Sequence, residues 1–162
     1  MNGWVVAALV CAGVVVVIVR RLRGEPLVAK EVFGTPFILI VIGGSSLLKQ
    51  HLTVTDVLWL ALASAVGIAF GAIRARTTKL FERDGVLWQR YTGWTFAVWA
   101  VSLAVNFGIG ALAVANGMHE QARPMPLSIG LSLLGEALMI AWRAKETGVP
   151  YAQPKTNGLV RR

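Results

Sequence analysis

Glu136 is the residue best placed to do chemistry, because it is the one carboxylate inside a long apolar stretch. A charge at the centre of a bilayer costs about 2.5–3.5 kcal/mol on insertion scales, so this side chain needs a partner or a proton. Ser132 lies one helical turn earlier, Arg143 lies two turns later, and Asn106 lies within another apolar stretch. Glu136, Asn106 and Ser132 therefore predict either a proton- or ion-responsive site or a hydrogen bond that holds two helices in register.

The two histidines do not have the spacing of metal ligands. His51 and His119 fall in expected loops, near Asp56 and Glu120. The sequence has no HExxH pattern, which would place two imidazoles on one helical face. We interpret both histidines as solvated loop residues and expect no metal and no other cofactor. Cys11 is the only cysteine, which excludes an intrachain disulfide and a CxxC redox pair.

Sequence motifs that are typical of enzymes are absent from the chain. It has no GxSxG, no Walker loop, no dinucleotide fingerprint and no pair of carboxylates within one apolar stretch. We therefore expect a protein that is not an enzyme.

Residues 78–91 predict a β-hairpin. Asp84-Gly85 separates two β-prone arms, and a type I′ turn requires positive φ at both central residues, which Asp-Gly tolerates. A lone two-stranded hairpin is marginal in water, so this one must rest on something. We expect either an ordered connector on the helix ends or a docking site for a partner.

The hairpin carries aromatic and basic side chains that could form such a docking site. The candidate docking residues are Phe81, Arg83, Trp88 and Tyr91. Alternation along the strands suggests two candidate apolar faces, which are Phe81 with Leu87 and Tyr91, or Leu80 with Val86 and Trp88.

These residues are positioned by a chain that is too apolar for a soluble domain. Of its 162 residues, 56% are hydrophobic and 15% are charged, whereas soluble domains carry about 25% charged residues. The apolar residues gather in five stretches, at 3–19, 32–48, 57–73, 94–115 and 127–142. A helix needs about 20 apolar residues to cross a bilayer, and several of these stretches are near the short limit. We predict an all-α membrane protein with one domain over 1–148, followed by a flexible basic tail over 149–162.

Basic residues alternate between the two sides of this predicted bundle. The first and third loops and the tail hold four, five and five Lys and Arg residues, whereas the second and fourth loops hold one each. Positive residues concentrate in cytoplasmic loops, so the N-terminus is expected outside and the C-terminus in the cytoplasm. The net charge of +8 is explained by these loops and by anionic lipid headgroups, and we expect no nucleic-acid partner.

Small residues predict where helices approach closely in lipid. Gly67 and Gly71 form a small-xxx-small series in the third stretch, and Gly43 and Gly44 lie in the second. The favoured interpretation is a tight intramolecular bundle, and the alternative is a homodimer seam along Gly67 and Gly71. Pro36 is expected to kink or open the second helix.

Part of the chain resembles the CcdC-like family of small bacterial membrane proteins. The resemblance covers roughly residues 30–115, through Gly34-Thr35-Pro36-Phe37 and through Arg74-Ala75-Arg76-Thr77 leading into Glu82-Arg83-Asp84-Gly85. It implies a multi-pass protein of the bacterial cytoplasmic membrane. The family is named for its association with cytochrome c maturation loci, which implies no catalytic residue here, and this chain lacks the cysteine pair of a thiol-transfer protein.

Two functions follow as hypotheses. The first is an accessory or interaction subunit that docks a membrane or cytoplasmic protein on the hairpin. The second is a small oligomeric transporter or proton-responsive subunit centred on Glu136 and Asn106. Five spans are few for a monomeric carrier, so the second function requires a homo-oligomer.

Overall fold

The structure is a computed structural model that describes residues 12, 15–16 and 19–153. Its long helices are α2 (Ala29–Leu47), α3 (Val54–Thr77), α4 (Gly93–Ala115) and α5 (Met125–Thr147), with a short 3₁₀ helix, η1 (Glu120–Ala122), before α5. Its strands are β1 (Glu25–Pro26), β2 (Lys79–Arg83) and β3 (Val86–Arg90). Within the described residues, four helices are long and apolar enough to cross a membrane. Most of the first predicted span, 3–19, lies outside these residues.

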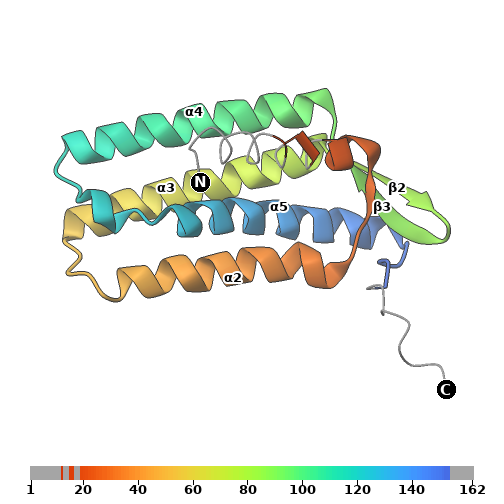
Figure 1. Ribbon diagram of the computed structural model, residues 1–162, viewed down its shortest axis with the longest axis horizontal. Helices are drawn as coiled ribbons and strands as arrows, with labels where there is room; N and C mark the ends of the chain where they lie inside the picture. The colour runs from red at the N-terminus through yellow and green to blue at the C-terminus, as the bar shows by residue number, and fades with distance from the viewer. Residues whose placement is uncertain (1–11, 13–14, 17–18, 154–162) are drawn as a thin grey trace, which may run out of the picture.

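The four long helices run side by side, and the strands lie at one end of the bundle (Figure 1). We call this end the sheet end, and we call the opposite end, with the connections at 48–53 and 116–124, the loop end. The helices match the second to fifth predicted spans but extend beyond most of them. Two capping boxes set helix starts that hydropathy does not show, because Thr53 and Asp56 cap α3 and Thr92 and Thr95 cap α4.

Glycines bring α5 against α2 and α3. A Cβ atom on Gly43 would collide with the backbone of Leu127, and one on Gly71 would collide with the carbonyl of Ser132. Gly44 faces open space, and a Cβ on Gly67 would meet the Ser128 carbonyl oxygen at an ordinary 3.9 Å. Gly43 and Gly71 are therefore used within the chain's own bundle, and the space beside Gly71 is filled by α5 and not by a second copy.

The strands form an antiparallel sheet in the order β1-β3-β2. The predicted hairpin is present, with Asp84 and Gly85 at φ values of 55° and 74° in its turn. Strand β1 was not predicted, because two residues that include Pro26 carry no readable alternation.

The register of the hairpin corrects both predicted apolar faces. Phe81 lies opposite Trp88, and Glu82 lies opposite Leu87. Directly opposed residues point to the same face, so Phe81 shares a face with Trp88 while Leu87 points to the other. The groupings of Phe81 with Leu87 and of Leu80 with Trp88 are therefore wrong. Across the two-residue turn, each odd-numbered residue of β2 is paired with an even-numbered residue of β3, so these residues share one face of the sheet.

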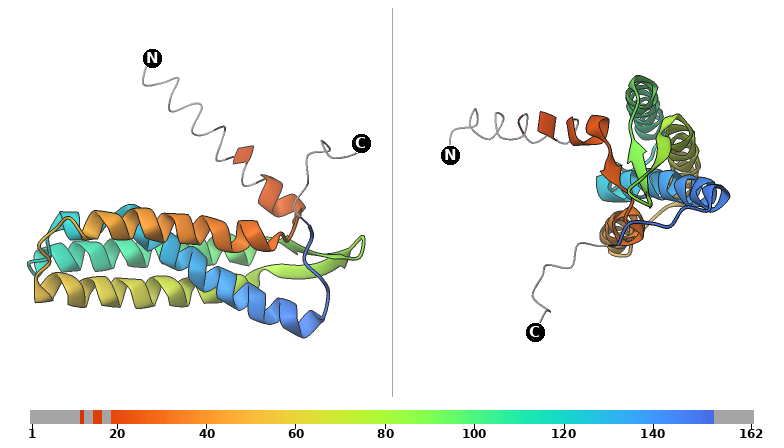
Figure 2. Two further views of the ribbon diagram at one scale, coloured as in Figure 1. Left: turned by 90° about the horizontal axis from the view of Figure 1, so that it is seen from below. Right: turned by 90° about the vertical axis from the view of Figure 1, so that its right-hand side faces the viewer.

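One face of the sheet is packed onto the helix ends. Leu87 is fully buried in a cluster completed by Leu27, Ala75, Ile140 and Ala144. Figure 2 shows that the hairpin continues past the helix ends, so its turn projects away from the bundle. The expectation of an ordered connector that rests on the helix ends therefore agrees with the structure.

The segment after α5 is fixed to the same sheet. The Leu87 amide donates to the Pro150 carbonyl at 3.0 Å, and the Ala152 amide donates to the Leu27 carbonyl at 3.0 Å. Val149 and Tyr151 pack against the Leu87 cluster. The predicted flexible tail over 149–162 is therefore wrong for 149–152, which is ordered by these bonds, and 154–162 lies outside the described residues.

Candidate functional site

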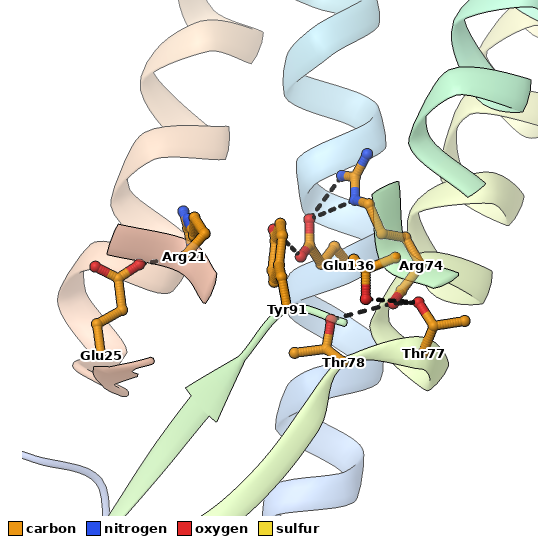
Figure 3. Close-up of polar contacts among 8 residues, drawn as sticks. Arg21, Glu25, Arg74, Thr77, Thr78, Tyr91 and Glu136 are labelled. Atoms are coloured by element: carbon orange, nitrogen blue, oxygen red, sulfur yellow. Dashed lines mark hydrogen bonds and ion pairs between the residues drawn. The ribbon is translucent and has the colours of Figure 1, made fainter. Parts of the chain in front are cut away.

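The carboxylate of Glu136 is held by a guanidinium from another helix. Arg74 donates from Nε at 2.9 Å and from an Nη at 2.6 Å to the same carboxylate oxygen of Glu136 (Figure 3). The side chains of Arg74 and Glu136 are only 5% and 7% exposed. Two charge-assisted hydrogen bonds in a buried setting offset part of the cost of removing both charges from water.

The second carboxylate oxygen of Glu136 binds a side chain from the sheet. Tyr91, directly after β3, donates its hydroxyl to this oxygen at 2.5 Å. Burial raises the pKa of the Tyr91 phenol well above its ordinary value, and the negative charge of Glu136 raises it further. The hydroxyl therefore stays protonated and remains a donor. We call Arg74, Tyr91 and Glu136 the Glu136 cluster, and it joins α3, β3 and α5.

A second ion pair, formed by Arg21 and Glu25, lies beside this cluster. The Arg21 guanidinium lies 5.0 Å from the centre of the Tyr91 ring, and it forms an ion pair with Glu25 at 2.9 Å. The Tyr91 amide also donates to the Arg21 carbonyl at 3.0 Å. Figure 3 shows the Tyr91 ring standing between Arg21 and the carboxylate of Glu136.

Small residues on both helices allow the pair to form. Gly71 lies one turn before Arg74, where its missing side chain lets the backbone of α5 approach at Ser132 and Glu136. Gly135, next to Glu136, accommodates the backbone of α3 at Ile68 in the same way. Because α3 and α5 approach so closely, the side chains of Arg74 and Glu136 are within hydrogen-bonding distance of each other.

Asn106 is not a partner of Glu136, which corrects the predicted pairing. Its amide donates to the Ser102 carbonyl at 2.9 Å, within its own helix. Ser132 lies against Gly71, and among the described residues neither Asn106 nor Ser132 is hydrogen-bonded to Glu136. Arg143, two turns after Glu136, donates to the Thr78 carbonyl at 2.8 Å and also to that of Ala75.

Two arginines were assigned to loops by their charge but lie against the helices. Arg74 is within the last turn of α3, because that helix continues to Thr77. Arg123 follows η1, and its guanidinium donates to the Asn106 carbonyl and occupies the space beside Gly110. The available signal for Arg74 was its position three residues after Gly71, on the same side of the helix.

Two cavities meet at the Glu136 cluster. A cavity of about 330 Å³ at the sheet end is lined by Glu25, Gln89, Tyr91 and Glu136, among others. The Gln89 side-chain oxygen is buried there without a hydrogen-bond partner among the described residues. A second cavity of about 680 Å³, mostly apolar, runs between α4 and α5 from Arg74 towards Arg123 and His119 at the loop end. Glu136 therefore lines the first cavity, and its partner Arg74 lines the second.

At the loop end, Asp56 connects two segments. It accepts from the His119 amide at 2.9 Å and lies 3.0 Å from the His119 ring nitrogen. His119 is an exposed loop residue, as predicted, and its contact with Asp56 was not predicted. Asp56 also completes the cap of α3 by accepting from the Thr53 amide. Among the described residues, no group of three or more His, Cys, Asp and Glu side chains could hold a metal ion.

The outward face of the sheet carries three of the four predicted docking residues. Phe81 and Trp88 have ring centres 6.4 Å apart, and the Arg83 guanidinium lies 4.9 Å from the Trp88 ring centre. The indole nitrogen of Trp88 has no hydrogen-bond partner among the described residues. Tyr91 does not belong to this face, because it points to Glu136. We call Phe81, Arg83 and Trp88 the aromatic patch.

No protein-family model, curated protein or solved structure matches the chain. The resemblance to the CcdC-like family therefore stays a prediction.

Proposed function

We propose that the protein is a non-enzymatic, multi-pass subunit of the bacterial cytoplasmic membrane that presents its sheet as a rigid docking surface. The sheet end lies in the cytoplasm and the loop end lies outside, as the distribution of Lys and Arg favours. The aromatic patch is the surface that a partner protein contacts.

The Glu136 cluster is the observation that carries this proposal. Tyr91 ties the end of β3 to the carboxylate of Glu136, which Arg74 already holds inside the bundle. Backbone hydrogen bonds from Leu87 to Pro150 and from Leu27 to Leu87 join β3 to the segment after α5 and to the residue after β1. A surface held in one orientation loses less conformational entropy on binding than a mobile loop does.

The partner chemistry follows from the donors on the patch. The Arg83 guanidinium is exposed on the patch and lies over the Trp88 ring, whereas the Trp88 indole nitrogen is itself buried. Tryptophan and arginine are the residue types most often found at the energetic centre of protein interfaces. A carboxylate of a partner would accept from the exposed Arg83 guanidinium, while the aromatic rings beside it offer apolar contact, so the proposed partner presents an acidic segment.

Site-specific photo-crosslinking in intact cells tests this docking. A crosslinking residue in place of Val86, which lies opposite Arg83 on the face of the patch, should give one protein adduct of defined mass. That adduct should disappear with Arg83→Glu, which reverses the charge that a carboxylate would contact, and should weaken with Trp88→Phe, which reduces the ring over which Arg83 lies. A crosslinking residue at Lys49, at the loop end, is the positional control, and Lys49→Gln is the control substitution. Adducts with lipid alone, or a protein adduct that is unaffected by Arg83→Glu, would contradict the proposal.

A second candidate function is favoured by the two cavities. Because Glu136 lines the sheet-end cavity and Arg74 lines the larger one, opening of this ion pair would join them into a path along the bundle. In this alternative the protein is a small oligomeric transporter or proton-responsive subunit, and the closed pair is its gate.

Proton flux into liposomes tests the alternative. Protein reconstituted with an enclosed pH-sensitive dye should show a flux that Glu136→Gln changes severalfold, since loss of one charge weakens the gate. Glu146→Gln, which is exposed on α5 and lines neither cavity, is the matched control. A flux equal to that of empty liposomes for both the native protein and Glu136→Gln would end this candidate.

A further inference from the structure

A third cavity, of about 500 Å³, lies where α3 passes into β2, and basic side chains surround it. Its charged lining consists of Arg76, Lys79, Arg90 and Arg143, with no carboxylate among the lining residues. Among the described residues, none of these four forms an ion pair with a carboxylate. We call this cavity the basic groove. It is distinct from the Glu136 cluster, and it borders the aromatic patch at Phe81, which also lines the groove.

The strand register concentrates positive charge in the groove. Lys79 and Arg90 are direct partners across the β2–β3 pair. Like charges placed directly opposite each other destabilise an antiparallel pair. An anion bound between Lys79 and Arg90 would attract both side chains and offset the repulsion between them.

One wall of the groove is already fixed. Arg143 donates to the carbonyls of Ala75 and Thr78 at the end of α3, so its guanidinium is held in place by backbone contacts. Thr77 and Thr78 also line the groove between this arginine and β2. A cation that is ordered before the ligand arrives reduces the entropy lost on binding.

The position of the groove indicates which anion it meets. It lies at the ends of helices that are apolar enough to cross a membrane, and two exposed tryptophans mark the same level, Trp94 at the start of α4 and Trp142 near the end of α5. Tryptophan is enriched where hydrocarbon meets headgroups. Juxtamembrane basic clusters attract anionic lipids.

We propose that the basic groove binds the phosphate of an anionic phospholipid. The lipid lies with its phosphate between Arg76, Lys79 and Arg90, beside the fixed guanidinium of Arg143, while its chains follow the apolar helix surface. This inference rests on the membrane location in the proposed function but not on the docking of a protein partner.

Lipid retention by the purified full-length protein tests the proposal. Native mass spectrometry of protein from mixed phosphatidylcholine and phosphatidylglycerol nanodiscs should show one phosphatidylglycerol retained in preference. The variant Arg76→Gln/Lys79→Gln/Arg90→Gln should bind it at least about tenfold more weakly, given the attraction per basic residue near an anionic surface. The control Arg20→Gln/Arg23→Gln/Lys145→Gln removes the same charge outside the groove and should retain it.

Melting temperatures separate lipid binding from misfolding. In phosphatidylcholine discs, the melting temperature of Lys79→Gln should equal or exceed that of the native protein, because the substitution relieves the repulsion with Arg90. Added phosphatidylglycerol should stabilise the native protein more than the groove variant. Equal loss of phosphatidylglycerol by the groove and control variants would overturn the proposal, and so would its displacement by millimolar inorganic phosphate, which would identify a soluble ion as the ligand. Failure of the crosslinking experiment would leave these results unchanged, so the two proposals fail separately.

Discussion

At the scale of residues, Glu136 is a member of a closed three-residue cluster and not a solitary acid. Arg74 occupies one of its oxygens and Tyr91 occupies the other. Of the two interpretations that the sequence allowed, a bond that holds elements in register describes this geometry, with the sheet as a third element. The same contacts are what a gate would have to break.

Removal of the charge on Glu136 should destabilise the protein strongly. Glu136→Gln leaves the buried Arg74 guanidinium without a counter-charge, which costs about 3–5 kcal/mol when one partner of a buried pair is lost. The free energy of unfolding in detergent measures this loss, with Glu120→Gln as the control. Arg74→Met/Glu136→Leu, which removes both charges, should recover most of the stability. A change below about 1 kcal/mol for Glu136→Gln would show that the pair is not formed.

Tyr91 should ionise only above the ordinary tyrosine pKa of 10.0, because burial and Glu136 both favour its neutral form. Its contribution to stability is complete below about pH 10 and decreases as the pH rises further, since the unfolded chain then releases a proton that the folded protein retains. Tyr151→Phe leaves Tyr91 as the only tyrosine, so tyrosinate absorbance reports it directly. Half-ionisation at pH 10 in the folded protein would contradict the buried contact with Glu136.

At the scale of elements, the fold depends on the close approach of α5 to α2 and α3 and on the docking of the sheet. The same spacing rule that predicted a Gly67–Gly71 seam does not distinguish the two glycines, because both lie on one side of α3. Their roles differ in the structure, since only Gly71 lies where a Cβ would strike the backbone of α5. This difference provides a matched test.

Gly71→Ala should separate α3 from α5 and weaken the Glu136 cluster. The added methyl group would overlap the Ser132 carbonyl, and such overpacking costs typically about 1–3 kcal/mol. Gly67→Ala should change the free energy of unfolding by less than about 0.5 kcal/mol, because its nearest neighbour would be at 3.9 Å. Equal effects of the two substitutions on unfolding in detergent would contradict this packing of α3 on α5.

The sequence predicted the elements better than their contacts. Asp84-Gly85 was enough for the hairpin, and apolar stretches located the four long helices. The extra turn of α3 that carries Arg74 was missed because a charged residue after an apolar run is read as loop. The third strand and the Glu136–Tyr91 bond arise from contacts between segments far apart in the chain, which no local pattern encodes.

At the scale of the whole molecule, the two ends of the bundle differ in charge and in build. The sheet end holds the ordered strands, the basic groove and the Glu136 cluster, whereas the loop end is fastened by Asp56 and His119. The docking proposed above uses only the sheet end of the bundle.

Cysteine accessibility should reveal this orientation. In a Cys11→Ala background, a cysteine in place of Glu82, in the hairpin, should react only after the membrane is permeabilised. A cysteine in place of Glu120, at the loop end, should react with a membrane-impermeant reagent in intact cells. Both glutamates are exposed, so neither label requires repacking. The reverse pattern would place the sheet outside and contradict the proposed cytoplasmic docking.

Hydrogen–deuterium exchange of β3 in nanodiscs tests the central claim, that the Glu136 cluster makes the sheet a rigid part of the bundle. In the native protein, the amides of β3 should exchange as slowly as those in the middle of α5. In Glu136→Gln and Tyr91→Phe they should exchange at least about tenfold faster, which corresponds to about 1.4 kcal/mol of lost local stability. Rapid exchange of β3 in the native protein, or exchange that neither substitution changes, would contradict the claim.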